Sequence, residues 1–401
     1  MHLQHLSLTN FRSLTRLDVD VPKGTIVLVG DNAQGKTSVL EAIFMLATMT
    51  SFNSDSDREL INFYAAREKL SVARIKAEFR RGGRPHQLEV RIIQELQRNN
   101  GARGRKEVLV DGVKRKVGEA VGQFNAVLFL PQMMSIIDGS PSHRRRYLDL
   151  ALAQVTPGYT DTLSGYNRVL EQRNALLKQL SDHNGGQEQL EYWDEQIAGF
   201  GARLIYARIH AVQEMETLAA LIHRDLTQGR EILRLNYYPA YDPLPETGEQ
   251  YTLRLDDPRD RTSFTLQQIQ KGFMDALQKL HREEIARGVT TIGPHRDELR
   301  FLSNSVDLGT YGSRGQIRTA LLTIKLAEVQ WMKQKTGHWP VLLLDEVLAE
   351  LDNQRRAELL QRISSCEQGL MTTTDMNLFT PAFIEQTKVW EIKEGRLTVT
   401  S

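Results

Sequence analysis

The chain of 401 residues contains a single cysteine, Cys366. One thiol excludes an internal disulfide framework and a metal site built from several thiolates, and a reducing cytoplasm is the expected setting. Long apolar runs are also missing, since the longest are strand-like pieces such as residues 341–344, far below the about 20 residues that cross a bilayer. Charged residues interrupt the N-terminal segment too early for a signal peptide. We therefore expect a cytoplasmic protein without a membrane anchor.

An excess of charge of one sign is lacking as well, because the formal net charge is only +1. Nucleic-acid binding can then be argued only from local patches of charge. The hydrophobic fraction of 40% and the charged fraction of 25% are near the averages of globular proteins. A chain of this length is long for one core and suggests two lobes.

What the sequence does contain is a glycine-rich loop with a lysine and a threonine at its end, in residues 30–37. A β-branched apolar run, residues 25–29, precedes it, and apolar residues at helical spacing follow from residue 38. Strand, loop and helix are the context of a phosphate-binding loop, whose backbone N–H groups and helix N-terminus cradle phosphates. The predicted ligands are a nucleotide, with Lys36 on its β- and γ-phosphates, and Mg²⁺, with Thr37 on the metal. The nucleotide-binding loop residues are Gly30, Asp31, Asn32, Ala33, Gln34, Gly35, Lys36 and Thr37.

Two acids follow a second buried run, residues 341–344. Asp345 is predicted to hold Mg²⁺, and Glu346 to orient or deprotonate the attacking water. Gln132, at the end of the strand predicted over residues 126–130, is placed to contact the metal, the γ-phosphate or that water. Such strand-end residues are often merely exposed, but the phosphate loop in the same chain favours the catalytic interpretation.

Small residues at 312–316 precede a helix predicted to run to about residue 335. Exposed backbone N–H groups at a helix N-terminus suit a phosphate, so this is a second candidate anion site. Taken alone, a simple serine-capped helix is the better interpretation.

The remaining patterns predict the following elements. Alternation indicates a strand over residues 6–10 and two hairpins, 73–79 with 88–92 and 107–110 with 113–117, with a polar, basic loop at 99–106. We expect a helix from Ser140-Pro141, a helical hairpin broken at residues 182–186 with a second arm over 187–226, a strand at 233–237 and a helix over 265–287. The expected domains are residues 1–139 and 290–401 as two parts of one head, with residues 140–289 as a helical lobe.

Together these motifs resemble the ABC-type ATPases, and among them the RecF recombination proteins of bacteria. Residues 8–14 resemble that family's N-terminal motif, residues 30–37 resemble its Walker A motif, and residues 129–132 resemble its Q-loop. Residues 139–149 resemble the segment that begins its helical lobe, and residues 293–299 resemble a later motif. Residues 313–319 resemble the ABC signature, and residues 342–352 resemble Walker B followed by the D-loop. The resemblance covers the whole chain and is weakest over residues 182–260. It implies an α/β fold: an ABC-type ATPase head with a mixed β-sheet and P-loop, plus an inserted, mainly helical lobe.

The resemblance also implies a mechanism. Arg12 joins the nucleotide site, and Ser313, Gly315 and Gln316 of one copy complete the ATP pocket of a second copy. Catalytic roles fall to Glu346 and Gln132, and metal binding to Thr37, Asp345 and Gln132. Such a protein dimerises when it binds ATP and hydrolyses ATP slowly, at a rate that DNA stimulates. It binds single-stranded, gapped or junction DNA. It also helps RecO- and RecR-like partners to load recombinase during replication restart and the SOS response.

Candidate DNA-phosphate contacts lie in the basic loop and the second hairpin that follows it: Arg103, Arg105, Lys106, Lys114, Arg115 and Lys116. A solvated charged hairpin is an equally good interpretation. Residues 144–146 are arginines that can instead support the Q-loop or the lobe interface, and His295 is interpreted as a packed histidine without chemistry.

Three other classes compete with this interpretation. The ATPase subunit of an ABC transporter would carry a switch histidine where this chain has residues 372–375, Thr-Thr-Thr-Asp, and would lack the large helical insertion. Such a subunit should co-purify with a membrane protein. A chromosome-organising ATPase needs a far longer arm, and a small-molecule kinase does not need the signature.

Overall fold

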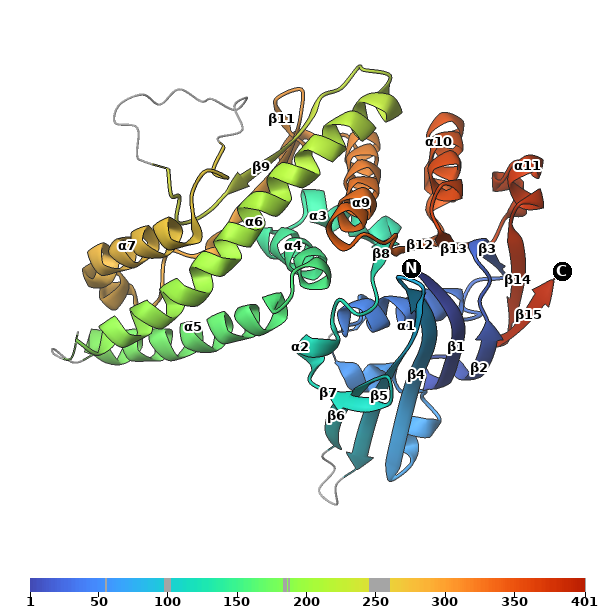
Figure 1. Ribbon diagram of the computed structural model, residues 1–401, viewed down its shortest axis with the longest axis horizontal. Coiled ribbons are helices and arrows are strands. Elements are labelled where there is room, and N and C mark those ends of the chain that lie inside the picture. The colour runs from blue at the N-terminus through green and yellow to red at the C-terminus, as the bar shows by residue number, and fades with distance from the viewer. Residues whose placement is uncertain (55, 97–101, 183–185, 187, 245–259, 401) are drawn as a thin grey trace. The chain divides into compact units, whose positions relative to one another are not determined.

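A computed structural model describes the chain except residues 55, 97–101, 183–185, 187, 245–259 and 401 (Figure 1). It groups residues 1–133 with 328–401 as one compact unit and residues 134–327 as a second. The second unit extends past residue 290, and the domain limits expected from the sequence stay a prediction. Parts of the predicted basic loop, 99–101, and of the break in the helical hairpin, 183–185, lie outside the described residues. So do residues 245–259, where the sequence between the predicted strand and helix indicates a polar, proline-rich loop.

The first unit contains a six-stranded antiparallel sheet in the order β2-β1-β4-β5-β6-β7. Its strands are β1 (His2–Phe11), β2 (Leu14–Asp20), β4 (Leu70–Arg81), β5 (Arg84–Leu96), β6 (Ala102–Val110) and β7 (Val113–Arg115). Both predicted hairpins are present, as β4 paired with β5 and β6 paired with β7. In the first hairpin alternate residues face the core, whereas the short β7 is exposed throughout. The predicted basic loop is wrong for residues 102–106, which belong to β6 and pair with β5. Lys106 faces the same side as the buried Val108, so this charged stretch still follows the period of a strand.

The same unit contains a second, mixed sheet in the order β15-β14-β3-β13-β12-β8. Its strands are β3 (Gly24–Val29), β8 (Ala126–Phe129), β12 (Val341–Asp345), β13 (Gln368–Thr373), β14 (Lys388–Lys393) and β15 (Arg396–Thr400), and all but β15 run parallel. Helix α1 (Lys36–Thr48) contacts strands of both sheets and contributes most of its residues to a shared core. The near-continuous apolar strands match this burial on both faces.

Short elements connect the strands of the first unit. They are η1 (Asp57–Leu60), η2 (Ala65–Arg67), α2 (Val117–Ala120), η3 (Pro131–Met134), η5 (Val347–Glu350), α10 (Asn353–Ser364), η6 (Met376–Leu378) and α11 (Pro381–Glu385). The boundary between the units at residue 327 falls within α9 (Arg314–Thr336).

The second unit is mainly helical. Its helices are α3 (Ser135–Asp138), α4 (Pro141–Val155), α5 (Tyr159–Asp182), α6 (Gln189–Thr227), α7 (Leu266–Arg287), η4 (Pro294–Arg296) and α8 (Leu308–Tyr311). Helices α5, α6 and α7 pack side by side, as Figure 1 shows. The expected second arm is confirmed as the 39-residue α6, which continues through Gly199 and Gly201. A three-stranded sheet, β11-β10-β9, completes the unit with β9 (Leu233–Tyr238), β10 (Glu298–Ser303) and β11 (Val306–Asp307).

Helix α7 shows how local sequence sets its ends. Thr265 and Gln268 form a reciprocal capping box at the N-terminus, which satisfies two otherwise unpaired N–H groups. Gly288 ends the helix in the left-handed conformation, with φ 64°. The predicted helix over residues 265–287 is therefore confirmed.

The arginines near 144–146 and the later motif at 293–299 contact each other inside the second unit. Arg144 forms an ion pair with Glu298 at 2.7 Å, and Arg145 donates to the carbonyl oxygen of Asp297 at 2.9 Å. Arg208, 2% exposed, forms ion pairs with Asp297 and Asp149, each at 2.8 Å. Burial alone would lower the pKa of Arg208, but the two carboxylates outweigh it and raise that pKa well above its usual value. These ion pairs and hydrogen bonds join the two motifs within the second unit.

His295 takes part in the same network as a neutral side chain. Its Nδ1 accepts a hydrogen bond from the Tyr166 hydroxyl at 2.7 Å, and its Nε2 lies 3.2 Å from the carbonyl oxygen of Thr290. Burial lowers the pKa of His295 to about 4, so the ring stays uncharged at neutral pH.

Replacing Asp297 with asparagine should destabilise the helical unit by about 3 kcal/mol, because Arg208 would lose a charged partner in a buried setting. Urea unfolding monitored by circular dichroism measures this free energy. Asp275→Asn, an exposed position on α7, is the matched control and should change it by less than about 0.5 kcal/mol. Equal stability of the two variants would show that Asp297 does not support the fold.

Candidate functional site

The glycine-rich loop connects β3 to α1, as the sequence predicts. Gly35 caps the helix with φ 107°, a conformation that favours glycine. At Gly30 a Cβ atom would collide with the carbonyl oxygen of Ile392 on β14. Both glycines are therefore required by backbone geometry, which turns the loop back over the N-terminus of α1.

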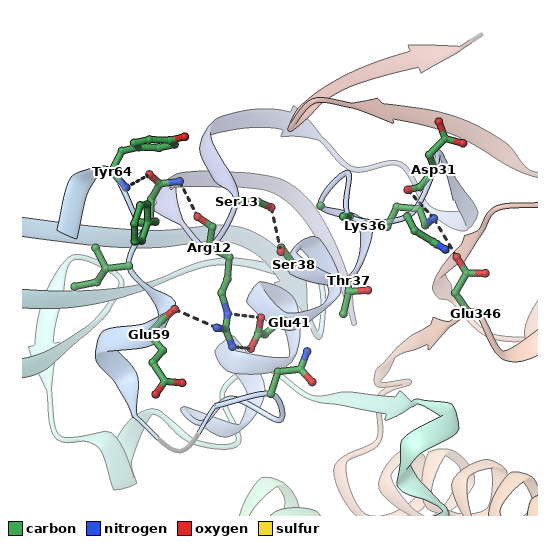
Figure 2. Close-up of a pocket in the computed structure, with 17 residues that line it drawn as sticks. Arg12, Ser13, Asp31, Lys36, Thr37, Ser38, Glu41, Glu59, Tyr64 and Glu346 are labelled. Atoms are coloured by element: carbon green, nitrogen blue, oxygen red, sulfur yellow. Dashed lines mark hydrogen bonds and ion pairs between the residues drawn. The ribbon is translucent and has the colours of Figure 1, made fainter. Parts of the chain in front are cut away.

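Lys36, 5% exposed, lies beneath this loop. Its Nζ donates to the carbonyl oxygens of Gly30 at 2.6 Å and Asp31 at 3.2 Å. The same Nζ forms an ion pair with Glu346 Oε1 at 3.0 Å, and Figure 2 shows the two side chains pointing toward each other. The ammonium is thus engaged by three oxygens on the protein, one of them the predicted catalytic carboxylate.

Thr37 meets the carboxylate at the end of β12. Its hydroxyl lies 3.1 Å from Asp345 Oδ1 and 2.9 Å from Oδ2, although the two residues are 308 positions apart in the chain. Strands β3 and β12 flank β13 in a parallel arrangement, so their carboxyl ends lie at the same edge of the sheet. One hydroxyl with one carboxylate is a donor set that suits Mg²⁺, which is commonly held by few protein oxygens together with phosphates and water.

Arg12 also lines this region, but its guanidinium is held in place by partners from the protein. It binds both carboxylate oxygens of Glu41 at 2.9 and 2.7 Å and donates to the carbonyl oxygen of Glu59 at 3.1 Å (Figure 2). Glu41 is 2% exposed and accepts a further hydrogen bond from Ser51. Sequence reasoning missed Glu41, although its place one helical turn after Lys36 and Thr37, among apolar residues, was a usable signal.

Most of these residues line one cavity of about 690 Å³, a size that suits a nucleotide. Arg12, Glu41 and Glu346 line it together with six residues of the loop: Asp31, Asn32, Ala33, Gly35, Lys36 and Thr37. Two aromatic residues line it as well, Phe63 with 66% and Tyr64 with 77% of the side chain exposed. Sequence reasoning missed this pair, and the only signal was the presence of two adjacent aromatic residues.

The other predicted site residues do not line this cavity. Gly30, Gln34 and Asp345 lie next to residues that do, and Asp345 is hydrogen-bonded to Thr37. Gln132 lies exposed in η3 of the same unit. Ser313, Gly315 and Gln316 belong to the second unit, where Ser313 and Gln316 cap α9 through hydrogen bonds of 3.2 and 3.1 Å. The roles proposed for these residues stay predictions.

The six basic residues of the predicted DNA-contact set differ in their surroundings. Lys106 is 15% exposed and bound to the carbonyl oxygen of Met49 and to Asp57, so it supports the fold. Lys114 and Arg105 pair with Glu107, and the hydrogen bond from Lys114 lowers the pKa of that carboxyl. Arg115 lies 3.8 Å from Glu119. Within the described parts of the chain, no ion pair is found for the exposed Arg103 and Lys116.

No group of three or more His, Cys, Asp and Glu side chains in the described ranges is arranged to hold a metal ion. Across the same part of the chain, no helix has the length and apolar character to cross a membrane.

Comparison with known proteins gives matches over the full length of the chain. A family model described as RecF/RecN/SMC N terminal domain matches residues 2–397. A protein of Chloroflexus aggregans is 39% identical over 408 residues, with 99% of each chain covered, and one of Exiguobacterium sp. is 35% identical over 401 residues, with 100% of each covered. Both are named "DNA replication and repair protein RecF".

Solved structures agree with these matches. One, described as the recombination mediator protein RecF-ATPrS in the RecFOR pathway, has a TM-score of 0.82 and 28% identity, covering 100% of this chain and 98% of its own. A structure of an Smc head bound to the C-winged helix domain of ScpA has a TM-score of 0.52 at 14% identity, and so supports the fold alone. The expected fold class, an ABC-type ATPase head with an inserted helical lobe, is confirmed.

Proposed function

The chain belongs to the RecF family of DNA replication and repair proteins, and on that premise we propose that it is an ATP-dependent DNA-binding recombination protein. The observation that carries this proposal is the meeting of Lys36, Thr37 and Glu346 around one nucleotide-sized cavity, with Asp345 hydrogen-bonded to Thr37. The relatives' names supply the DNA-repair context, and the structure described with an ATP analogue supports ATP as the ligand.

Five residues in or beside the cavity have roles that follow from their chemistry. Bound Mg²⁺ would neutralise charge on the phosphates, and Thr37 and Asp345 would hold it. Lys36 would bind the β- and γ-phosphates. Glu346 would then leave Lys36 and orient the attacking water, accepting its proton as hydrolysis proceeds. Arg12, fixed by Glu41, would present its remaining N–H groups to the nucleotide without needing to reorganise.

The chain carries one phosphate loop and one signature segment, so a complete hydrolytic site would need a second copy. In the proposal, Ser313 and Gly315 of each copy complete the ATP pocket of the other, and the closed dimer retains single-stranded, gapped or junction DNA. ATP hydrolysis, which would be slow and stimulated by DNA, then opens the dimer and releases the DNA. RecO- and RecR-like proteins are the proposed partners in loading recombinase, a context that fits replication restart and the SOS response.

Binding to a panel of single-stranded, duplex and gapped DNA, with and without ATP at a stated salt concentration, tests the proposal directly. Light scattering on the same samples reports the oligomeric state. We expect retention of DNA and a doubling of mass only with ATP. A protein that stays monomeric with ATP, or that binds DNA equally without nucleotide, would contradict the ATP-gated dimer.

Tyr64→Ala should weaken ATP binding about tenfold, because the exposed ring in the cavity offers a face on which the adenine base can stack. Calorimetric titration with ATP and with inorganic tripolyphosphate separates the base from the phosphates. Tyr238→Ala, a half-exposed position on β9, is the control and should bind both ligands normally. If Tyr64→Ala weakened the binding of ATP and of tripolyphosphate equally, this would show that the ring does not recognise the adenine base.

Replacing Arg103 and Lys116 together with alanine should weaken DNA binding and reduce the slope of log affinity against log salt by about 2, roughly one unit for each phosphate contact. These two side chains are exposed and are not used in the ion pairs of the described sheet. Fluorescence anisotropy at several salt concentrations gives the slope. The double variant Lys23→Ala/Lys393→Ala, also exposed, should leave it unchanged, and an unchanged slope in the first variant would exclude this hairpin from the DNA surface.

A further inference from the structure

Thr372 lies on β13, the strand between those that carry the phosphate loop and the acidic pair. In the parallel register it stands directly beside Asp345. Its side chain is 4% exposed, and its hydroxyl makes two hydrogen bonds. The hydroxyl donates to Asp345 Oδ1 at 2.7 Å and accepts from the backbone N–H of Glu346 at 3.0 Å. One buried oxygen atom thus contacts the carboxylate of Asp345 and the backbone N–H of Glu346.

The bond to Asp345 orients a carboxylate that would hold the metal. Asp345 is also bound by Thr37, but in the proposed function the hydroxyl of Thr37 is itself a ligand of Mg²⁺. Thr372 comes from a different strand and lies outside the phosphate loop. Its bond can therefore keep the plane of the carboxylate fixed both before and after nucleotide enters.

The bond to Glu346 holds an unusual backbone conformation. Glu346 has φ 52°, in the left-handed region that residues other than glycine seldom adopt. This turn at the end of β12 directs the side chain to Lys36, as Figure 2 shows. The Thr372 hydroxyl accepts the N–H of that residue, so it helps to maintain the direction of the proposed catalytic carboxylate.

We propose that Thr372 is a positioning residue for nucleotide hydrolysis, setting the orientation of Asp345 and the backbone turn of Glu346 through one hydroxyl. The inference rests on the proposed ATPase function, because it needs those two acids to act on the metal and the water. The proposed role of Thr372, at the carboxyl end of β13, depends on its hydroxyl group. A β-branched side chain suits the task, since its χ1 rotamer is restricted within a strand.

Thr373, the next residue, is a natural control. It is also buried, 2% exposed, but its hydroxyl bonds locally to the carbonyl oxygen and N–H of Asp375 and reaches neither acid. Valine at either position keeps the shape and removes the hydroxyl. A difference between Thr372→Val and Thr373→Val therefore reports the two bonds to the acids, not the loss of a buried hydroxyl in general.

The experiment compares the full-length wild type with Thr372→Val, Thr372→Ser and Thr373→Val. Steady-state kinetics give kcat and KM for ATP, calorimetry gives ATP affinity with and without Mg²⁺, and thermal melting checks folding. We expect Thr372→Val to lower kcat about 30-fold and to weaken the gain in ATP affinity from Mg²⁺, with metal-free ATP affinity within about twofold of wild type. Thr372→Ser should stay within about threefold in kcat, and Thr373→Val should match the wild type.

Wild-type kcat in Thr372→Val, or an equal loss in Thr372→Ser, would overturn the inference and leave the proposed function standing. A wild type that neither binds nor hydrolyses ATP would overturn both. If Thr372→Val does not fold, Thr372→Ala takes its place, and the same comparison of ATP affinity with and without Mg²⁺ decides the question.

Discussion

Lys36→Ala is expected to weaken binding of ATP at least about 100-fold and to abolish nucleotide-dependent retention of DNA. The buried ammonium is the cation of the phosphate loop, and charge-assisted hydrogen bonds to phosphate oxygens are among the strong ones. Removing it also leaves the carboxylate of Glu346 next to the incoming phosphates without its neutralising partner. Calorimetric titration of the full-length protein with ATP and Mg²⁺ measures the loss.

Lys23→Ala is the matched control, because Lys23 is exposed on the turn that precedes β3 and does not line the cavity. It should bind ATP as the wild type does. Lys36→Arg keeps the charge but not the compact ammonium that fits beneath the loop, and it should weaken nucleotide-driven dimerisation and DNA retention together. Wild-type ATP affinity in Lys36→Ala would remove the loop from the proposed mechanism.

Glu346→Gln should lower ATP turnover about 100-fold or more and, in contrast, tighten nucleotide binding about fivefold. Turnover falls because an amide cannot accept the proton of the attacking water. Binding tightens because the Lys36–Glu346 ion pair, with Glu346 still 30% exposed, must break when phosphate arrives, and a partly exposed pair of this kind is worth about 1 kcal/mol. The variant should therefore accumulate as an ATP-bound dimer.

Affinity for ADP separates the two effects, since ADP binding involves no hydrolysis. Glu391→Gln, an exposed carboxylate on β14 away from the cavity, should change neither affinity nor turnover. Unchanged turnover in Glu346→Gln would exclude it as the base, and unchanged ADP affinity would show that the ion pair does not compete with nucleotide.

Local sequence was sufficient for the elements whose signals are contained in a few residues. The phosphate loop, the strand ending in Asp345, the capped helix after Thr265 and the Asp111-Gly112 hairpin all appear where the sequence predicts them. Each of these elements is indicated by hydrogen bonds, or by a spacing of apolar residues, between residues that are close in the sequence. Residues 102–106 form part of strand β6, whereas the sequence predicts a loop there. The prediction fails because the charged residues of this stretch obscure the alternation of apolar and polar residues that indicates a strand.

The sequence by itself determined which chemical groups the protein carries: a phosphate loop, a strand-end acid pair and a signature segment. Only the tertiary structure decided their partners, such as Glu41 with Arg12, Glu346 with Lys36 and Thr372 with Asp345. The physical reason is that these contacts depend on the order of strands in the sheet. Placing β13 between β3 and β12 brings together groups as far apart as 308 residues, and no local pattern encodes that order.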